Sequence, residues 1–246
     1  MNNVFIILVK PQLGQNIGSV ARVMKNLNFK NLRIVNPRDG WPNHDVMTTA
    51  AGADDIVKNT QVFDNISEAC NDLNYLFASS ARKRDLNIKT LNLVNTISSL
   101  NKTEFCRNDF KFGILFGCES SGLSNEDLIT ANQLIYIPSN SDFSSLNISH
   151  AVSLICWEFF KFFNDSSLDQ ISKISQNTSP TIKDMDYFYK TLFDKLNDSG
   201  FFHSDFMKKS IMENIKVLFN RAELSSQEIK TLNGIIKSLY EYNKQA

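Results

Sequence analysis

The sequence lacks the patterns that mark several common classes of protein. The four cysteines form no C-x-x-C pair and the three histidines lie far apart, so no zinc-site spacing is present. No G-x-G-x-x-G occurs, which disfavours a dehydrogenase or an ordinary Rossmann-type methyltransferase. The longest apolar runs, such as Val4–Val9, are too short to span a bilayer, and no signal segment is present. We therefore expect a cytoplasmic protein with reduced thiols, no metal and no contact with a membrane.

The sequence also lacks an excess of charge of either sign. Its 246 residues contain 26 Lys and Arg and 26 Asp and Glu, which gives a formal net charge of zero. This balance disfavours a protein that binds nucleic acid through bulk phosphate attraction alone. It is compatible with a local basic patch, for which Arg82, Lys83 and Arg84 are candidates, although a short basic run is more often a solvated loop. The length suits one domain of moderate size plus an appendage.

Short apolar runs alternate with helical patterns through residue 163. The runs expected to be strands are 4–9, 32–35, 62–63, 75–78, 112–116 and 134–137. Helical spacing is found at 16–27, 46–53, 68–73, 89–100 and 147–163. We expect Asn16 and Ser67 to be N-caps of the first and third of these helices. The alternation predicts an α/β fold with a parallel sheet and helices on both faces.

Two polar loops follow the last two predicted strands. The first is FGCESSGL at 116–123 and the second is SSLNISHA at 144–151. Gly117 and Gly122 allow a tight turn and a close approach of the backbone to a ligand. Glu119 offers carboxylate oxygens, although it could instead cap the helix that follows Ser124. Such loops can hold a polar small molecule at the ends of strands.

These two loops resemble the second and third motifs of the SpoU-type (TrmH-like) RNA 2′-O-ribose methyltransferases of the SPOUT class. The run NIGSVAR at 16–22 is similar to the first motif, a helix with an Asn and an Arg. Three motifs in the right order are specific, whereas either loop alone would be a weak signal. The resemblance implies a SPOUT fold with a C-terminal trefoil knot, a homodimer, and S-adenosyl-L-methionine as the methyl donor.

The resemblance also implies which residues form the site. The residues expected to contact S-adenosyl-L-methionine, many through backbone groups, are Ser79, Ser80, Ala81, Gly117, Ile137, Ser145, Leu146 and Asn147. The residues expected to be catalytic are Arg22, Asn16, Glu119, Ser145 and Asn147. No metal is needed. One departure from the family is Cys118, which stands where a basic residue is common.

Arg22 is the residue expected to act on the ribose hydroxyl. A guanidinium stays protonated at ordinary pH and has no acceptor, so a role as general base would need a strong pKa shift. Orientation of the ribose and a neighbouring phosphate, or stabilisation of the developing oxygen charge, fits its chemistry better. Viewed on its helix alone, Arg22 is an ordinary surface arginine, and the three motifs together favour the catalytic interpretation.

The composition changes after residue 163. Residues 164–183 have the Ser, Asp, Gln and Asn content of a linker, and residues 184–246 show three helical stripes, the last with a Ser225–Glu228 capping box. The run LFNRAEL at 218–224 and the following residues resemble the C-terminal extension of the TrmJ-like subgroup. That subgroup methylates the ribose of the first anticodon-loop nucleotide of tRNA, position 32. We therefore expect a methyltransferase domain at 1–163, a linker, and a helical domain at 184–246.

Three functions are compatible with these observations. The first is an S-adenosyl-L-methionine-dependent tRNA (cytidine/uridine-2′-O-)-methyltransferase. The second is an enzyme of the same class that acts on rRNA, because the loops that select RNA are the least readable part of the chain; the helical domain at the C-terminus argues against it. The third is a non-catalytic RNA-binding SPOUT protein, against which stand the intact Asn16, Arg22, Glu119 and Asn147.

Overall fold

The computed structural model describes residues 1–81, 86–164 and 179–243, and the basic run 82–84 and most of the predicted linker lie outside them. Within the described residues, the strands form one seven-stranded sheet in the order β3-β2-β1-β6-β4-β7-β5, with every neighbouring pair parallel. The strands are β1 (Val4–Val9), β2 (Asn31–Val35), β3 (Gln61–Phe63), β4 (Tyr75–Ser79), β5 (Thr90–Asn92), β6 (Phe112–Phe116) and β7 (Gln133–Tyr136). The predicted parallel α/β fold is confirmed, whereas the trefoil knot stays a prediction.

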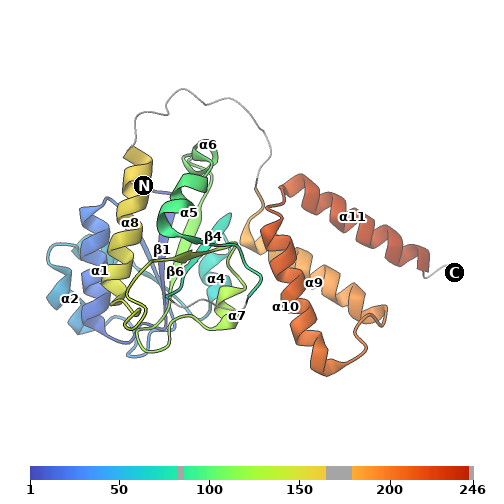
Figure 1. Ribbon diagram of the computed structural model, residues 1–246, viewed down its shortest axis with the longest axis horizontal. Helices are drawn as coiled ribbons and strands as arrows, with labels where there is room; N and C mark the ends of the chain where they lie inside the picture. The colour runs from blue at the N-terminus through green and yellow to red at the C-terminus, as the bar shows by residue number, and fades with distance from the viewer. Residues whose placement is uncertain (82–85, 165–178, 244–246) are drawn as a thin grey trace.

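Helices cover both faces of this sheet. One buried cluster joins the sheet to α1, α5 and α8, and a second joins its other face to α4 and α7. In Figure 1, α1 and α8 accordingly lie on one side of β1 and β6, with α4 and α7 on the other. The helices of this part are α1 (Gly14–Asn26), α2 (His44–Ala50), α3 (Asp54–Lys58), α4 (Ile66–Cys70), α5 (Leu93–Ser99), α6 (Lys102–Phe105), α7 (Asn125–Leu128) and α8 (Ile148–Asn164).

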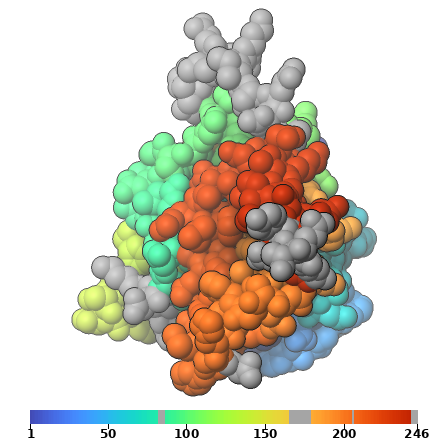
Figure 2. Space-filling view, turned by 90° about the vertical axis from the view of Figure 1, so that its right-hand side faces the viewer, coloured from blue at the N-terminus to red at the C-terminus, as the bar shows by residue number. Residues whose placement is uncertain are grey.

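Three long helices follow: α9 (Ile182–Asp198), α10 (Asp205–Arg221) and α11 (Ser226–Asn243). They share a small core of their own, in which Phe188, Tyr189, Phe193 and Ile229 are buried. Figure 2 shows their orange and red surface in front of the sheet domain, and α9 contacts α4. None of the described helices is long and apolar enough to cross a lipid bilayer.

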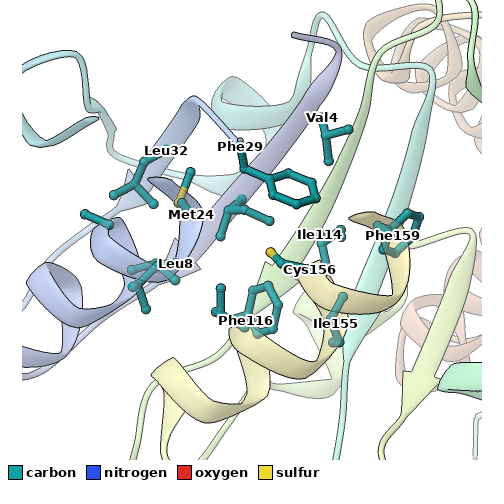
Figure 3. Packing of buried hydrophobic residues seen from close by; sticks show 14 of the residues in the cluster. Val4, Leu8, Met24, Phe29, Leu32, Ile114, Phe116, Ile155, Cys156 and Phe159 are labelled. Carbon is teal, nitrogen blue, oxygen red and sulfur yellow. The ribbon is translucent and has the colours of Figure 1, made fainter. Parts of the chain in front are cut away.

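The core of the sheet domain explains why the first apolar run is continuous. Val4, Ile6 and Leu8 of β1 face one buried cluster, whereas the residues between them face the other. Such a central strand needs apolar residues at every position. Figure 3 shows the first cluster, in which Met24 of α1 and Phe159 of α8 pack with Val4 and Leu8. Each fully buried large side chain of this kind contributes roughly 1.5–3 kcal/mol.

Two predicted helix caps are wrong. Helix α1 begins at Gly14 and its N-cap residue is Leu13, which makes no side-chain cap. Asn16 therefore lies inside the first turn, where its side chain is free to bond elsewhere. Helix α4 begins at Ile66, because the side chain of Asn65 accepts the backbone N–H of Glu68. The predicted cap Ser67 instead donates to Asp186 of α9 at 2.8 Å.

Other elements differ in extent from the prediction. The region 89–100 is not one helix, because Thr90–Asn92 pairs with β7 before α5 begins. The predicted helix at 46–53 overlaps α2, which begins earlier and ends at Ala50, and α3 follows as a separate helix from Asp54. The capping box of Ser225 and Glu228 is present. Leu218 and Leu239, apolar residues at which the helical spacing of 184–246 predicts burial, are exposed.

Candidate functional site

A cavity lies where β4, β6 and β7 end. The strands are parallel, so the loops that follow them meet at one edge of the sheet, the usual place for a ligand in an α/β fold. The residues that line the cavity are Ser79, Ser80, Ala81, Phe116, Gly117, Cys118, Glu119, Ser120, Ser121, Gly122, Leu123, Ile137, Ser144, Ser145, Leu146, Ile148 and Ala151. Of the residues predicted to contact the donor, all except Asn147 are among them.

The loop from Gly117 to Leu123, which we call the donor loop, folds back on itself. The backbone N–H of Gly122 donates to the carbonyl of Cys118 at 2.9 Å, and Gly122 has a φ of +69°. A Cβ on Gly117 would lie 2.2 Å from both the carbonyl carbon of Gly122 and the backbone nitrogen of Leu123. Both glycines are therefore required by the turn itself, one for its φ and one for the close approach.

Glu119 holds this loop against the beginning of α1. Its Oε2 accepts the backbone N–H of Gln12 at 3.0 Å, and its Oε1 accepts Nδ2 of Asn16 at 2.7 Å. It does not cap α7, because Ser124 and Asp127 form that capping box between themselves. The alternative interpretation of Glu119 as a helix cap is therefore wrong.

Asn16 and Asn147 extend this contact to the third motif. Nδ2 of Asn147 donates to Oδ1 of Asn16 at 3.1 Å. Oδ1 of Asn147 accepts the backbone N–H of Ser149 at 2.9 Å and its hydroxyl at 2.7 Å, which caps the start of α8. One residue from each of the three sequence motifs thus belongs to a single hydrogen-bonded series: Glu119, Asn16 and Asn147.

Arg22 lies apart from this series. It is exposed on α1 and borders a shallow depression with Ser19, Asn26 and Thr49. It does not line the cavity, and within the described part of the chain its guanidinium makes no hydrogen bond or ion pair. A single chain therefore brings together four of the five predicted catalytic residues, Asn16, Glu119, Ser145 and Asn147, and leaves Arg22 elsewhere.

Gln12 and Ser120, which bond to each other at the donor loop, were not predicted from the sequence as site residues. Gln12 bonds to Glu119 through its backbone, and its side-chain amide donates to Oγ of Ser120 at 3.0 Å. Neither residue type signals a site on its own. The contact depends on the end of β1 lying beside the end of β6, which only the pairing of these strands shows.

Cys118 faces two hydroxyl groups in the wall of the cavity. Its Sγ lies 3.0 Å from Oγ of Ser121 and 3.7 Å from Oγ of Ser120. Burial raises the pKa of the Cys118 thiol, but hydrogen bonds from Ser121 and Ser120 outweigh it and hold the pKa below its usual value. Hydrogen bonding therefore favours the thiolate at this position.

The charge of the cavity restricts what it can hold. Among the described residues that line it, Glu119 is the only one with a charged side chain, and none of these residues is a lysine or an arginine. Such a lining suits a neutral or cationic polar molecule better than one that carries phosphates. Among the described residues, no three His, Cys, Asp or Glu side chains gather closely enough to bind a metal ion.

Comparisons with known proteins agree with these motifs. Residues 3–157 match the model of the SpoU rRNA Methylase family, and residues 183–246 match that of the tRNA methyltransferase TrmJ, C-terminal domain. The tRNA (cytidine/uridine-2′-O-)-methyltransferase TrmJ of Sodalis glossinidius is 31% identical over 99% of this chain and 94% of its own.

Solved structures show the same likeness. The crystal structure of TrmJ from Z. mobilis ZM4 is 32% identical, with a TM-score of 0.81, over 95% of this chain and 97% of its own. A probable methylase family protein from Haemophilus influenzae is 30% identical, with a TM-score of 0.63, over 99% of this chain and 98% of its own. On its motifs, its fold and these matches, the chain belongs to the SpoU methylase family and is of the TrmJ-like type.

Proposed function

We propose that this protein transfers a methyl group from S-adenosyl-L-methionine to the ribose 2′-hydroxyl of a cytidine or uridine at position 32 of tRNA. The observation that carries the proposal is the hydrogen-bonded series of Glu119, Asn16 and Asn147 beside the cavity. Support for tRNA as substrate comes from the names of the full-length relatives and from the match of residues 183–246 to a tRNA methyltransferase domain.

The lining of the cavity fits the proposed donor. S-adenosyl-L-methionine supplies a methyl group on a positively charged sulfur. A lining whose described residues include one carboxylate and no lysine or arginine is compatible with that charge. Ile137 and Leu146 offer apolar contacts for a nucleoside, and Ser79, Ser80 and Ser145 offer polar ones. Because the sulfonium is already reactive, the main task of the protein is to position the two reactants.

In this proposal, Arg22 acts on the nucleic acid. Its exposed guanidinium can orient the ribose and a phosphate through charge-assisted hydrogen bonds, or stabilise charge that develops on the 2′-oxygen. It has no acceptor with which to remove the proton, so the proton passes to another group.

The separation of Arg22 from the cavity leads to a proposal about assembly. We infer that the enzyme works as a homodimer in which Arg22 of one subunit reaches the cavity of the other. In support, α8 packs beside α1 and leaves Leu154 and Trp157 44% and 48% exposed, two large apolar side chains that an interface would cover. A subunit alone would then hold the donor without a complete catalytic set.

The remaining proposals concern the organisation of the chain. Residues 1–163 are the catalytic domain, 164–183 join the two parts, and 184–246 are a helical domain that takes part in tRNA binding. The capping box of Thr181 and Asp184 starts α9 at the end of this connection. We also propose the trefoil knot of the SPOUT fold for the catalytic domain, and the cytoplasm as the place where the enzyme acts.

The test is methyl transfer from labelled S-adenosyl-L-methionine to unmodified total tRNA, with mass spectrometry to identify the modified nucleoside. We expect a 2′-O-methylated pyrimidine with the wild type and its loss with Arg22→Ala. Lys25→Ala is the control on the same helix, because it removes only an exposed ion pair with Asp55.

Other outcomes separate the alternatives. Transfer to rRNA but not to tRNA would assign the enzyme to the rRNA class. Donor binding without transfer to either RNA would support the non-catalytic protein. Full activity of Arg22→Ala would remove Arg22 from the mechanism and leave the reaction itself in place.

A further inference from the structure

Helix α10 contacts the segment that directly follows the donor loop. Nδ2 of Asn220 donates to the backbone carbonyl of Ile129 at 3.1 Å. Val217, one turn earlier on α10, is only 6% exposed and belongs to the buried cluster that contains Leu123 and Leu128. The helical domain thus bonds to the segment between the donor loop and β7, and Val217 adds to the buried cluster on that face of the sheet.

The amide of Asn220 is held in a fixed orientation. The hydroxyl of Tyr189 on α9 donates to Oδ1 of Asn220 at 2.7 Å, which directs Nδ2 toward Ile129. Tyr189 is itself buried in the core of the helical domain. The support for Ile129 therefore comes from the interior of that domain and not from a mobile surface side chain.

The short helix α7 connects this contact to the donor loop and the cavity. Ile129 is the C-cap residue of α7, whose other end is fixed by the capping box of Ser124 and Asp127. Ser124 directly follows Leu123, which lines the cavity and whose backbone closely approaches Gly117. A displacement of α7 would therefore change the shape of the donor loop.

Helix α7 makes a second contact with the helical domain, and this contact is on the surface. Lys209 of α10 forms an ion pair with Glu126 of α7. Both side chains are about 70% exposed, 71% and 69%, so this pair contributes little by itself. The buried Val217 and the oriented Asn220 are the contacts that can hold α7 in place.

We propose that Asn220 and Val217 are positioning residues of the donor site, through which α10 holds α7 and the donor loop in the shape that binds S-adenosyl-L-methionine. This inference rests on the proposed donor cavity. It gives the helical domain a role in donor binding besides any contact with RNA. By linkage, a ligand that moves α10 changes donor affinity, and the donor changes the affinity of that ligand by the same factor.

The deciding variant is Asn220→Asp in the full chain. The new carboxylate still accepts the hydroxyl of Tyr189, but it replaces the N–H that faces Ile129 by an oxygen and repels the carbonyl there. We expect the Kd for S-adenosyl-L-methionine, measured by calorimetry without RNA, to rise about fivefold or more, the lower end of typical coupling between two sites. Hydrogen exchange of the amides at 117–123 should become faster.

Two controls separate positioning from general stability. Asn214→Ala changes an exposed asparagine of the same helix and should leave Kd unchanged. Ile229→Val removes a methyl group from the core of the helical domain and should lower the melting temperature with Kd unchanged. If Asn220→Asp does not give folded protein, Val217→Ala is compared with the same two controls.

The outcomes are distinct. A wild type that binds the donor and an Asn220→Asp that binds it equally well would overturn the inference and leave the proposed function intact. An equal rise of Kd in Ile229→Val would also overturn it, because the effect would then follow stability. A wild type that binds no S-adenosyl-L-methionine would refute the donor cavity and this inference together.

Discussion

Nδ2 of Asn16 lies 2.7 Å from Oε1 of Glu119 and joins the first turn of α1 to the donor loop. Because α1 begins at Gly14, the side chain of Asn16 is not needed as a helix cap and is available for this contact. Asn16 also accepts a hydrogen bond from Asn147. One series of hydrogen bonds therefore joins the donor loop, the first turn of α1 and the start of α8. The shape of the cavity therefore depends on three polar side chains, those of Glu119, Asn16 and Asn147.

The first prediction concerns Glu119. Glu119→Gln replaces one carboxylate oxygen by an NH2 group, so the side chain can no longer accept both the N–H of Gln12 and the amide of Asn16. We expect kcat/KM for methyl transfer to fall about tenfold or more, because a hydrogen bond to a charged group contributes roughly 1.5–3 kcal/mol. Asp109→Asn, which makes the same carboxylate-to-amide change at an exposed ion pair with Arg107 away from the cavity, is the control. Equal losses in both variants would contradict the role given to Glu119.

The second prediction tests the proposed dimer with two inactive variants. Arg22→Ala damages one part of the proposed composite site and Glu119→Ala the other. An equal mixture, unfolded and refolded together, should regain about a quarter of wild-type methyl transfer, because randomly formed mixed dimers carry one intact site each. Each variant refolded alone should stay inactive. If the mixture also stays inactive, Arg22 does not act across a subunit interface.

The third prediction compares two glycines. Gly117→Ala places a Cβ against the backbone of Gly122 and Leu123, which cannot move aside easily, so donor binding should be lost. Gly234 lies in α11 with open space around its would-be Cβ. Gly234→Ala should therefore stabilise the protein by about 0.5–1 kcal/mol, since alanine favours a helix over glycine. Calorimetry for the donor and thermal unfolding measure the two effects.

The fourth prediction concerns the order in which the thiols react with iodoacetamide. Only the thiolate reacts, and hydrogen bonds from serine hydroxyls lower the pKa of Cys118, so it should react at lower pH than Cys106, whose pKa burial raises. Cys70 is buried with its pKa raised to about 12 by burial, and should stay unmodified. Mass spectrometry across pH 6–9 gives the order.

A protection experiment links the same thiol to the cavity. S-adenosyl-L-methionine should slow the alkylation of Cys118, which lines the cavity, and leave that of Cys106 unchanged. Equal rates at Cys118 with and without the donor would show that the donor does not cover this wall.

The strands differ in how clearly the sequence predicts them. Val4–Val9 is buried on both faces, so its continuous apolar run identifies it. Thr90–Asn92 is at the edge of the sheet and none of its residues is buried. They carry no such pattern, and only the pairing with β7 makes this segment a strand. The misplaced cap of α4 has a different cause, because Asn65 and Ser67 are equally good caps by residue type alone.

The sequence by itself determined which segments are buried, where the three motifs lie and to which family the chain belongs, because these follow from local spacing and residue type. Only the tertiary structure decided that Asn16 meets Glu119 and Asn147, partners 103 and 131 residues away along the chain. It also separated Arg22 from them and brought α10 against Ile129. Contacts of this range depend on the order in which strands join the sheet, and no local pattern encodes that order.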